Sequence, residues 1–343
     1  MRPTFSIIAF TVLSGIGYGA WFLLGLGLAI GQVCGPRGAS YPSGISMRLC
    51  HAPLWSLGAL VLAFLLVGVG LLCSLGHLGK PQRAWRALSQ WRSSWLSREG
   101  VAALATFVPA TLLLAAAIVV PIMMAGVPAP SAQFSSWVFY AELSERALGL
   151  LLAAGSLLTV FCTANIYASL KPVRAWHDRH VVPAYLLLAL YGGGLLLPMF
   201  PMWARDRQVV LVGTIALSLS LVWLKQRYWR SIDAQAGVGA GRATGLDALG
   251  SVRSFEQPNT EENYLTHEMG FVLARRHAHK LRRIALGAAF VVPALLAALA
   301  LASPPAAPLV AWLGLASGLA GLFVERWLFF AEARHAVIAY YAH

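Results

Sequence analysis

Eight long apolar stretches divide this chain, and they constrain its fold more than any other feature. A helix needs about 20 apolar residues to cross the hydrocarbon core of a bilayer. Barrel strands would instead show short segments of alternating polarity. The sequence therefore predicts an all-α integral membrane protein, a bundle of eight transmembrane helices. The expected spans are Phe5–Ile30, Ala52–Ser74, Val101–Ala125, Leu143–Leu170, Val181–Phe200, Val209–Leu224 (the shortest), Ile284–Ala302 and Ala306–Phe330.

The composition favours a lipid environment and argues against nucleic acid as a partner. Charged residues make up 11% of the chain, whereas soluble domains carry about a quarter. The formal net charge is +13, but the Arg and Lys residues cluster in loops that flank the apolar stretches. No small-residue cleavage site follows the first stretch, so we expect it to be retained. Residues 1–343 are expected to form one polytopic membrane domain.

The distribution of basic residues predicts the orientation of the bundle. In an eight-helix arrangement one side carries 21 Lys and Arg residues and the opposite side carries five. Basic loops face the cytoplasm in most membrane proteins. Both termini are therefore expected to be cytoplasmic.

Two of the four cysteines lie in the first loop, on the predicted outer side. Cys34 and Cys50 would form a disulfide only in an oxidising compartment such as a periplasm. Two unpaired thiols are an equally good interpretation from the sequence alone. Cys73 and Cys162 fall within or near helices.

The longest polar segment, 225–283, is expected to be a cytoplasmic loop. Its Gly-rich part predicts an irregular chain. The part from Thr260 has acidic residues near its start and basic residues near its end, as the helix dipole favours. We interpret this part as a surface helix. It either docks a partner protein or is a plain surface helix.

The stretch from Gly76 to Glu99 concentrates ionisable and aromatic side chains at one membrane boundary. His77 follows the second span, Arg83 lies six residues on, and Glu99 begins the third span. A quinone has a lipid-soluble tail and a head group that exchanges two protons with two electrons, so a His and a carboxylate beside a fixed cation suit it. Alternatively, the arginines are only topology signals and the tryptophans an interfacial belt.

Two other classes of function are less favoured. Haem ligation uses helix-borne His pairs, but no His lies in the middle of an expected span, so we expect no haem, although one haem near the inner face stays open. An ion or solute transporter would favour ionisable groups at mid-bilayer, and the expected spans are nearly free of them. The sequence predicts no metal site in this chain.

Two segments resemble the family of membrane-anchor subunits of dimethyl sulfoxide reductase (DmsC). The first reads G-H-L-G-K-P-Q-R-A-W-R-A-L and continues to S-W-L-S-R-E. The second is Ala164–Leu170 with Val173-x-x-Trp176 and then Pro183, although Pro172 is displaced from the family's usual proline. The resemblance covers essentially the whole chain in helix count. The long sixth loop is similar to that of longer anchors, including those of membrane-bound sulfite-oxidising complexes.

This resemblance implies a specific role for the chain. Such anchors pair with an iron–sulfur subunit and a molybdopterin catalytic subunit in the inner membrane of bacteria, and they exchange electrons with ubiquinone or menaquinone. By motif, His77 and Glu99 match positions implicated in quinol binding, and Arg83 lies in the same motif. The predicted topology places the partners on the cytoplasmic face. That location favours a dehydrogenase, with sulfite as the donor, over a terminal reductase that oxidises quinol. The chain by itself would not act on the donor substrate.

Overall fold

The computed structural model describes residues 3–30, 53–76, 78–124, 132–200, 207–234, 241, 244–252, 255–256 and 277–337. Within these residues all regular secondary structure is helical, and the connecting turns contain one isolated bridge, between Val173 and His335. The membrane-length helices are α1 (Phe5–Ala29), α2 (Pro53–Leu75), α3 (Trp95–Met124), α4 (Ala132–Ala168), α5 (Val181–Leu196), α6 (Arg207–Ala234), α10 (Ala278–Leu286) continued by the π-turn η5 (Gly287–Val291) into α11 (Val292–Ala302), and α12 (Ala307–Ala331).

The described residues contain eight helical spans that are long and apolar enough to cross a membrane. This count confirms the predicted fold class. The segment from Ala278 to Ala302 counts as one span, because α10, η5 and α11 follow one another without a break. The compartment that each end of the bundle faces stays a prediction.

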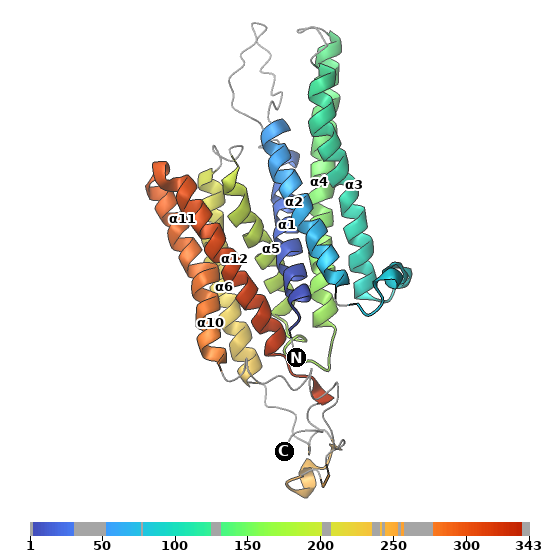
Figure 1. The fold of residues 1–343 in the computed structure, drawn as a ribbon, viewed down its shortest axis with the longest axis vertical. Helices are drawn as coiled ribbons and strands as arrows, with labels where there is room; N and C mark the ends of the chain where they lie inside the picture. The colour runs from blue at the N-terminus through green and yellow to red at the C-terminus, as the bar shows by residue number, and fades with distance from the viewer. Residues whose placement is uncertain are drawn as a thin grey trace.

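The bundle has α1 at its centre. α1 contacts α2, α4, α5 and α12, and Figure 1 shows α3 and α4 on one side of it with α6, α10, α11 and α12 on the other. The most apolar windows of α1 and α5 are each 72% buried, whereas no other span among the described residues exceeds 50%. We name the end of the bundle where α1 begins and α12 ends the basic end, because most of the described Lys and Arg residues lie there.

Close packing of α1 against its neighbours depends on glycine. A Cβ at Gly19 would overlap the carbonyl oxygen of Ala189 in α5. A Cβ at Gly193 of α5 would overlap the backbone of Gly19 in return. Small residues are the usual means by which membrane helices bring their backbones into contact. The crossing of α1 and α5 therefore requires both glycines.

Gly19→Ala is expected to lower the free energy of unfolding by about 3 kcal/mol, because the two backbones must separate. Gly15→Ala, on the same helix, is the matched control, since a Cβ there meets nothing within 4 Å. Thermal unfolding of the detergent-solubilised protein measures both. Equal midpoints for the two variants would show that the described crossing is not what holds α1 to α5.

The π-turn η5 is explained by Pro293, which lies two residues after its end. Pro293 has no N–H to donate to the carbonyl of Ala289, so that carbonyl loses its helical partner. The hydroxyl of Tyr191 in α5 donates to this oxygen instead. Ser317 of α12 donates to the neighbouring carbonyl of Ala288, with 2.9 Å between the two oxygens. Side chains from two other helices thus satisfy the freed backbone groups, as the lipid phase requires.

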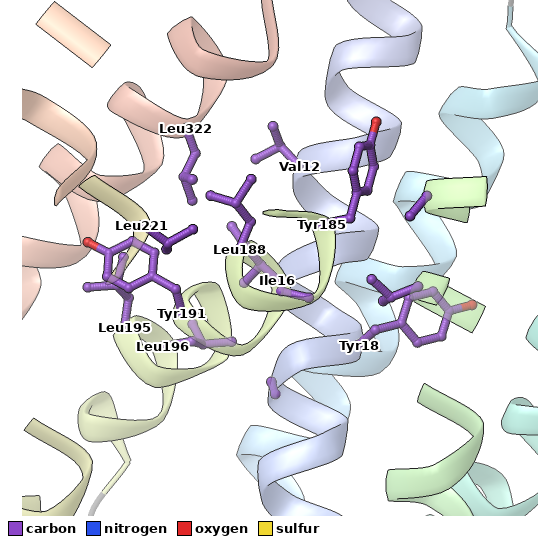
Figure 2. Packing of buried hydrophobic residues seen from close by; sticks show 14 of the residues in the cluster. Val12, Ile16, Tyr18, Tyr185, Leu188, Tyr191, Leu195, Leu196, Leu221 and Leu322 are labelled. Carbon is purple, nitrogen blue, oxygen red and sulfur yellow. The ribbon is translucent and has the colours of Figure 1, made fainter. Parts of the chain in front are cut away.

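The hydrophobic core surrounds α1 and α5. Trp21, wholly buried, packs edge to face against Phe107 and Phe64, with ring centroids 5.3 Å and 5.9 Å away. Figure 2 shows Val12 and Ile16 of α1 beside Leu188 of α5. These contacts fix the positions of the helices whose basic ends carry the candidate site.

The helices extend beyond the predicted boundaries where charged residues occur. α3 begins at Trp95 rather than Val101, and α6 ends at Ala234 rather than Leu224. The expected loop 225–283 therefore differs from the structure at both ends, because residues 225–234 continue α6 and residues 278–283 begin α10. Cys34, Cys50 and the expected surface helix from Thr260 lie outside the described residues.

Candidate functional site

The segment between α2 and α3 forms an exposed, amphipathic element at the basic end. Its residues Pro81–Gln90 make a 3₁₀ helix, η1, with no buried side chain. Trp85 and Trp91 are 68% and 52% exposed. The guanidinium groups of Arg86 and Arg92 each lie 5.6 Å from the ring centre of the tryptophan before them. Paired tryptophan and arginine side chains are typical of a membrane–water interface.

Arg98 fastens this segment to α3. It donates from Nε to the carbonyl of Trp91 and from Nη2 to the carbonyl of Arg92, over 3.1 Å and 2.6 Å. Its guanidinium also lies 4.4 Å from the ring centre of Trp95. Successive helical residues point about 100° apart, so the residue after Arg98 does not face the loop.

Glu99, the residue after Arg98, points into the bundle. Glu99 is 5% exposed, and Thr163 of α4 donates its hydroxyl to the carboxylate. A carboxyl group buried at membrane depth is costly and is therefore a functional candidate. The sequence prediction that Glu99 stands at the start of the third span agrees with the structure.

Further hydroxyl groups continue from Glu99 along α4. Thr163 and Thr159 are four residues apart and share one face of the helix. Thr159 shares a hydrogen bond of 3.3 Å with Thr106 of α3. Each of the three hydroxyls also lies within hydrogen-bond distance of a carbonyl of its own helix, and its single proton goes either to that carbonyl or to the partner named above. The interface of α3 and α4 therefore carries a polar track that starts at the buried carboxylate.

The other two predicted site residues are placed differently. Arg83 is exposed on η1, where its backbone N–H donates to the carbonyl of Lys80 over 3.0 Å. The hydrogen bond that the Glu99 carboxylate accepts among the described side chains comes from Thr163 and not from Arg83. His77 lies outside the described residues. Of the three expected site residues, the structure thus describes two: Glu99, a buried carboxylate, and Arg83, an exposed cation.

A buried ion cluster lies between α6 and α12. The Nζ atom of Lys225 is 2.6 Å from a carboxylate oxygen of Glu325, and Arg326 contacts both oxygens of the same carboxylate over 2.6 Å and 2.9 Å. The three residues are 1%, 1% and 4% exposed. One carboxylate between two cations gives the cluster a formal charge of +1.

Aromatic rings enclose this cluster. Lys225 lies 4.3 Å from the ring centre of Tyr228, and Arg326 lies 4.5 Å from that of Tyr185 and 4.8 Å from that of Phe329. Trp176, from the second family-like segment, donates its indole N–H to the carbonyl of Phe329 over 3.0 Å. Cations over aromatic faces gain about 2 kcal/mol when desolvated. The rings thus offset part of the cost of burying the charges.

A second network closes the basic end around residues 169–180. Asp178 accepts hydrogen bonds from Ser231 of α6 and from the backbone N–H of His180, over 2.6 Å and 2.9 Å. Burial raises the pKa of Asp178, but these bonds and the His180 ring outweigh it and hold the pKa below the ordinary value. Nearby, Arg282 bridges Asp233 and Glu332, which ties α6, α10 and α12 together.

Sequence reasoning missed Thr163 and the ion cluster. It placed Lys225 in a loop and described the spans as nearly free of ionisable groups, yet Lys225, Glu325 and Arg326 are buried inside helices. The available signal was the adjacent pair Glu325-Arg326 within an otherwise apolar span. A charge pair inside such a span indicates a partner on another helix.

Comparison with known proteins adds the family context. Residues 54–331 match the family model described as DMSO reductase anchor subunit (DmsC). The chain is also 31% identical to a protein from Allochromatium vinosum that is described as a subunit of sulfite dehydrogenase. That alignment covers 360 positions and 99% of each chain. The match therefore includes both the segment before α3 and the C-terminal helix.

Proposed function

The chain belongs to the DMSO reductase anchor subunit family, and from that membership we propose that it is the membrane-anchor and quinone-binding subunit of a three-subunit oxidoreductase. The other two subunits would be an iron–sulfur protein and a molybdopterin catalytic protein. Electrons would pass between the quinone pool and the iron–sulfur subunit. This chain would bind the quinone and handle its protons, and it would not act on the donor substrate.

The observation that carries the proposal is the buried carboxylate of Glu99 at the basic end of the bundle. Oxidation of a quinol releases two electrons and two protons, and reduction of a quinone takes up the same number. Glu99 can accept or give one of these protons at the lipid boundary. Thr163 holds the carboxylate by a hydrogen bond. His77 and Arg83, which precede Glu99 in the connecting segment, would contribute a second proton-exchanging group and a fixed cation.

Sulfite is the proposed donor. The relative described as a sulfite dehydrogenase subunit aligns over the full chain and supports this choice. The family description itself favours a second candidate, the quinol-oxidising anchor of a terminal reductase of the DMSO reductase type. The two candidates differ in the direction of electron flow and share the quinone site.

We propose that the basic end faces the cytoplasm and that the iron–sulfur partner docks there. The basic-residue asymmetry supports this orientation. Lys280 is exposed at the start of α10, whereas Lys225 is buried in the ion cluster. Cross-links to the partner are therefore expected from Lys280 and not from Lys225.

Sealed membrane vesicles of both orientations test the donor and the orientation together. Sulfite is a charged anion that does not cross a lipid bilayer readily. Sulfite added to inverted vesicles should reduce the quinone pool, while right-side-out vesicles should respond only after permeabilisation. The complex purified from these membranes should contain molybdenum and iron. Sulfite-dependent reduction only in right-side-out vesicles would contradict the orientation, and DMSO-dependent quinol oxidation without a response to sulfite would favour the second candidate.

A further inference from the structure

A small pocket lies inside the bundle between α1, α4, α5 and α12. It is one to two helical turns from the basic end: Thr11 is six residues from the start of α1, Tyr185 four from the start of α5, and Arg326 five from the end of α12. Figure 2 shows Tyr18, Tyr185, Leu188 and Leu322 around this region. The polar side chains of its wall are Thr11, Ser14, Tyr18, Thr163, Tyr185 and Arg326.

Two tyrosine hydroxyls in this wall lack a hydrogen bond of regular geometry. Tyr18 is 2% exposed and Tyr185 is 6% exposed, and among the described residues their hydroxyls have only longer or poorly aligned contacts, with Thr159 and with Arg326. A buried polar group left without a hydrogen bond is destabilising, because its lost contacts with water are not replaced. Two such groups that line the same pocket indicate that a hydrogen-bonding molecule occupies it.

The size of the pocket decides which molecule fits. Its volume is about 30 Å³. One water needs about 10–15 Å³ on this measure, so the pocket has room for about two waters. A quinone ring is several times larger and does not fit without movement of the helices. A buried water also needs two to four polar partners, and the polar side chains of the pocket wall can supply them.

The pocket adjoins Glu99 through one residue. Thr163 lines it and donates its hydroxyl to the Glu99 carboxylate. Arg326 lies on the wall formed by α12 and belongs to the ion cluster with Lys225 and Glu325. The positive charge of this cluster disfavours a resting excess proton in the pocket, so a proton there moves on to Glu99 or out to bulk water.

We propose that this pocket is a hydrated proton-exchange site for Glu99, with water bridging Thr163 to the hydroxyls of Tyr18 and Tyr185. The proposal rests on the proposed function, in which sulfite supplies the electrons and Glu99 gives a proton to the quinone as the quinone is reduced. The Thr163 hydroxyl then passes its proton to the Glu99 carboxylate and takes a proton from the bridging water. That proton is replaced past Tyr185 from the aqueous phase at the basic end. No electron is moved in this step, and protonated Glu99 is regenerated.

Tyr185→Phe removes one of the two tyrosine hydroxyls and keeps the ring. Tyr191→Phe is the matched control, because Tyr191 lies on the same helix and is also buried, but its hydroxyl donates to the carbonyl of Ala289 outside the pocket. The intact complex is transferred to D₂O at a pH low enough to protonate Glu99. The infrared C=O band of its carboxyl group, identified by its loss in Glu99→Gln, reports the rate of hydrogen–deuterium exchange.

Exchange at Glu99 is expected to slow about tenfold in Tyr185→Phe, which corresponds to one lost hydrogen bond of about 1.4 kcal/mol in the barrier. Tyr191→Phe should exchange at the wild-type rate. Tyr18→Phe repeats the test if Tyr185→Phe does not assemble. Wild-type exchange in both pocket variants would overturn the proposal.

The quinone readout separates this inference from the proposed function. If Glu99→Gln stops quinone turnover while the pocket variants exchange normally, the function stands and the pocket is not the route. If Glu99→Gln leaves quinone turnover intact while Tyr185→Phe slows exchange, the pocket serves Glu99 but Glu99 does not serve the quinone.

Discussion

Glu325→Gln is expected to be the most destabilising conservative substitution in the described bundle. It removes the single anion of the ion cluster and leaves Lys225 and Arg326 as two neighbouring cations, 1% and 4% exposed, without a counter-charge. Removing one partner of a buried ion pair costs about 3–5 kcal/mol, because the remaining charge stays desolvated. Thermal unfolding of the detergent-solubilised protein measures the loss.

Glu142→Gln provides the matched control for this prediction. Glu142 pairs with Arg146 on the same helix, but the two side chains are 38% and 45% exposed. An exposed pair of this kind contributes about 0–1 kcal/mol. A second control is Lys225→Met combined with Glu325→Gln, which removes one of the two stranded cations and should recover part of the loss. Equal unfolding midpoints for Glu325→Gln and Glu142→Gln would contradict the buried cluster.

The sequence predicted the number and type of the spans because hydropathy over about 20 residues depends only on local composition. It predicted their ends less well. An apolar window stops at Lys225, yet α6 continues to Ala234 because Lys225 finds Glu325 on α12 and Asp233 finds Arg282 on α10. Those partners are 100 and 49 residues away along the chain, so no local pattern reveals them.

In the candidate site, too, the sequence predicted what depends on local composition and missed what depends on contacts between helices. The position of Glu99 at the start of a span was predictable, since the motif and the hydropathy change coincide there. Its partner Thr163 was not, because the pairing depends on how α3 and α4 face each other. Arg83 was expected beside Glu99, but the 3₁₀ helix η1 keeps it exposed. Although Arg83 and Glu99 are close in sequence, Arg83 is exposed on η1 and Glu99 is buried in the bundle.

Glu99→Gln is expected to lower quinone-coupled turnover of the complex by about 100-fold or more. Gln keeps the size and the hydrogen-bonding capacity of the side chain but cannot exchange a proton, and general acid–base groups contribute about 10²–10⁴-fold. His77→Ala should also reduce coupling if the segment before α3 serves the head group. The hydrogen bond from Thr163 can still be accepted by the amide oxygen, so assembly should be unaffected.

The decisive measurement compares two electron acceptors in the same purified complex. With quinone as acceptor, Glu99→Gln should lose about 100-fold in turnover, whereas Glu142→Gln should match the wild type. With a soluble acceptor that takes electrons directly from the partner subunits, all three proteins should turn over within about twofold of one another, because the donor chemistry lies outside this chain. An assembled Glu99→Gln complex that reduces quinone at the wild-type rate would contradict the assignment of this buried carboxylate to the quinone site.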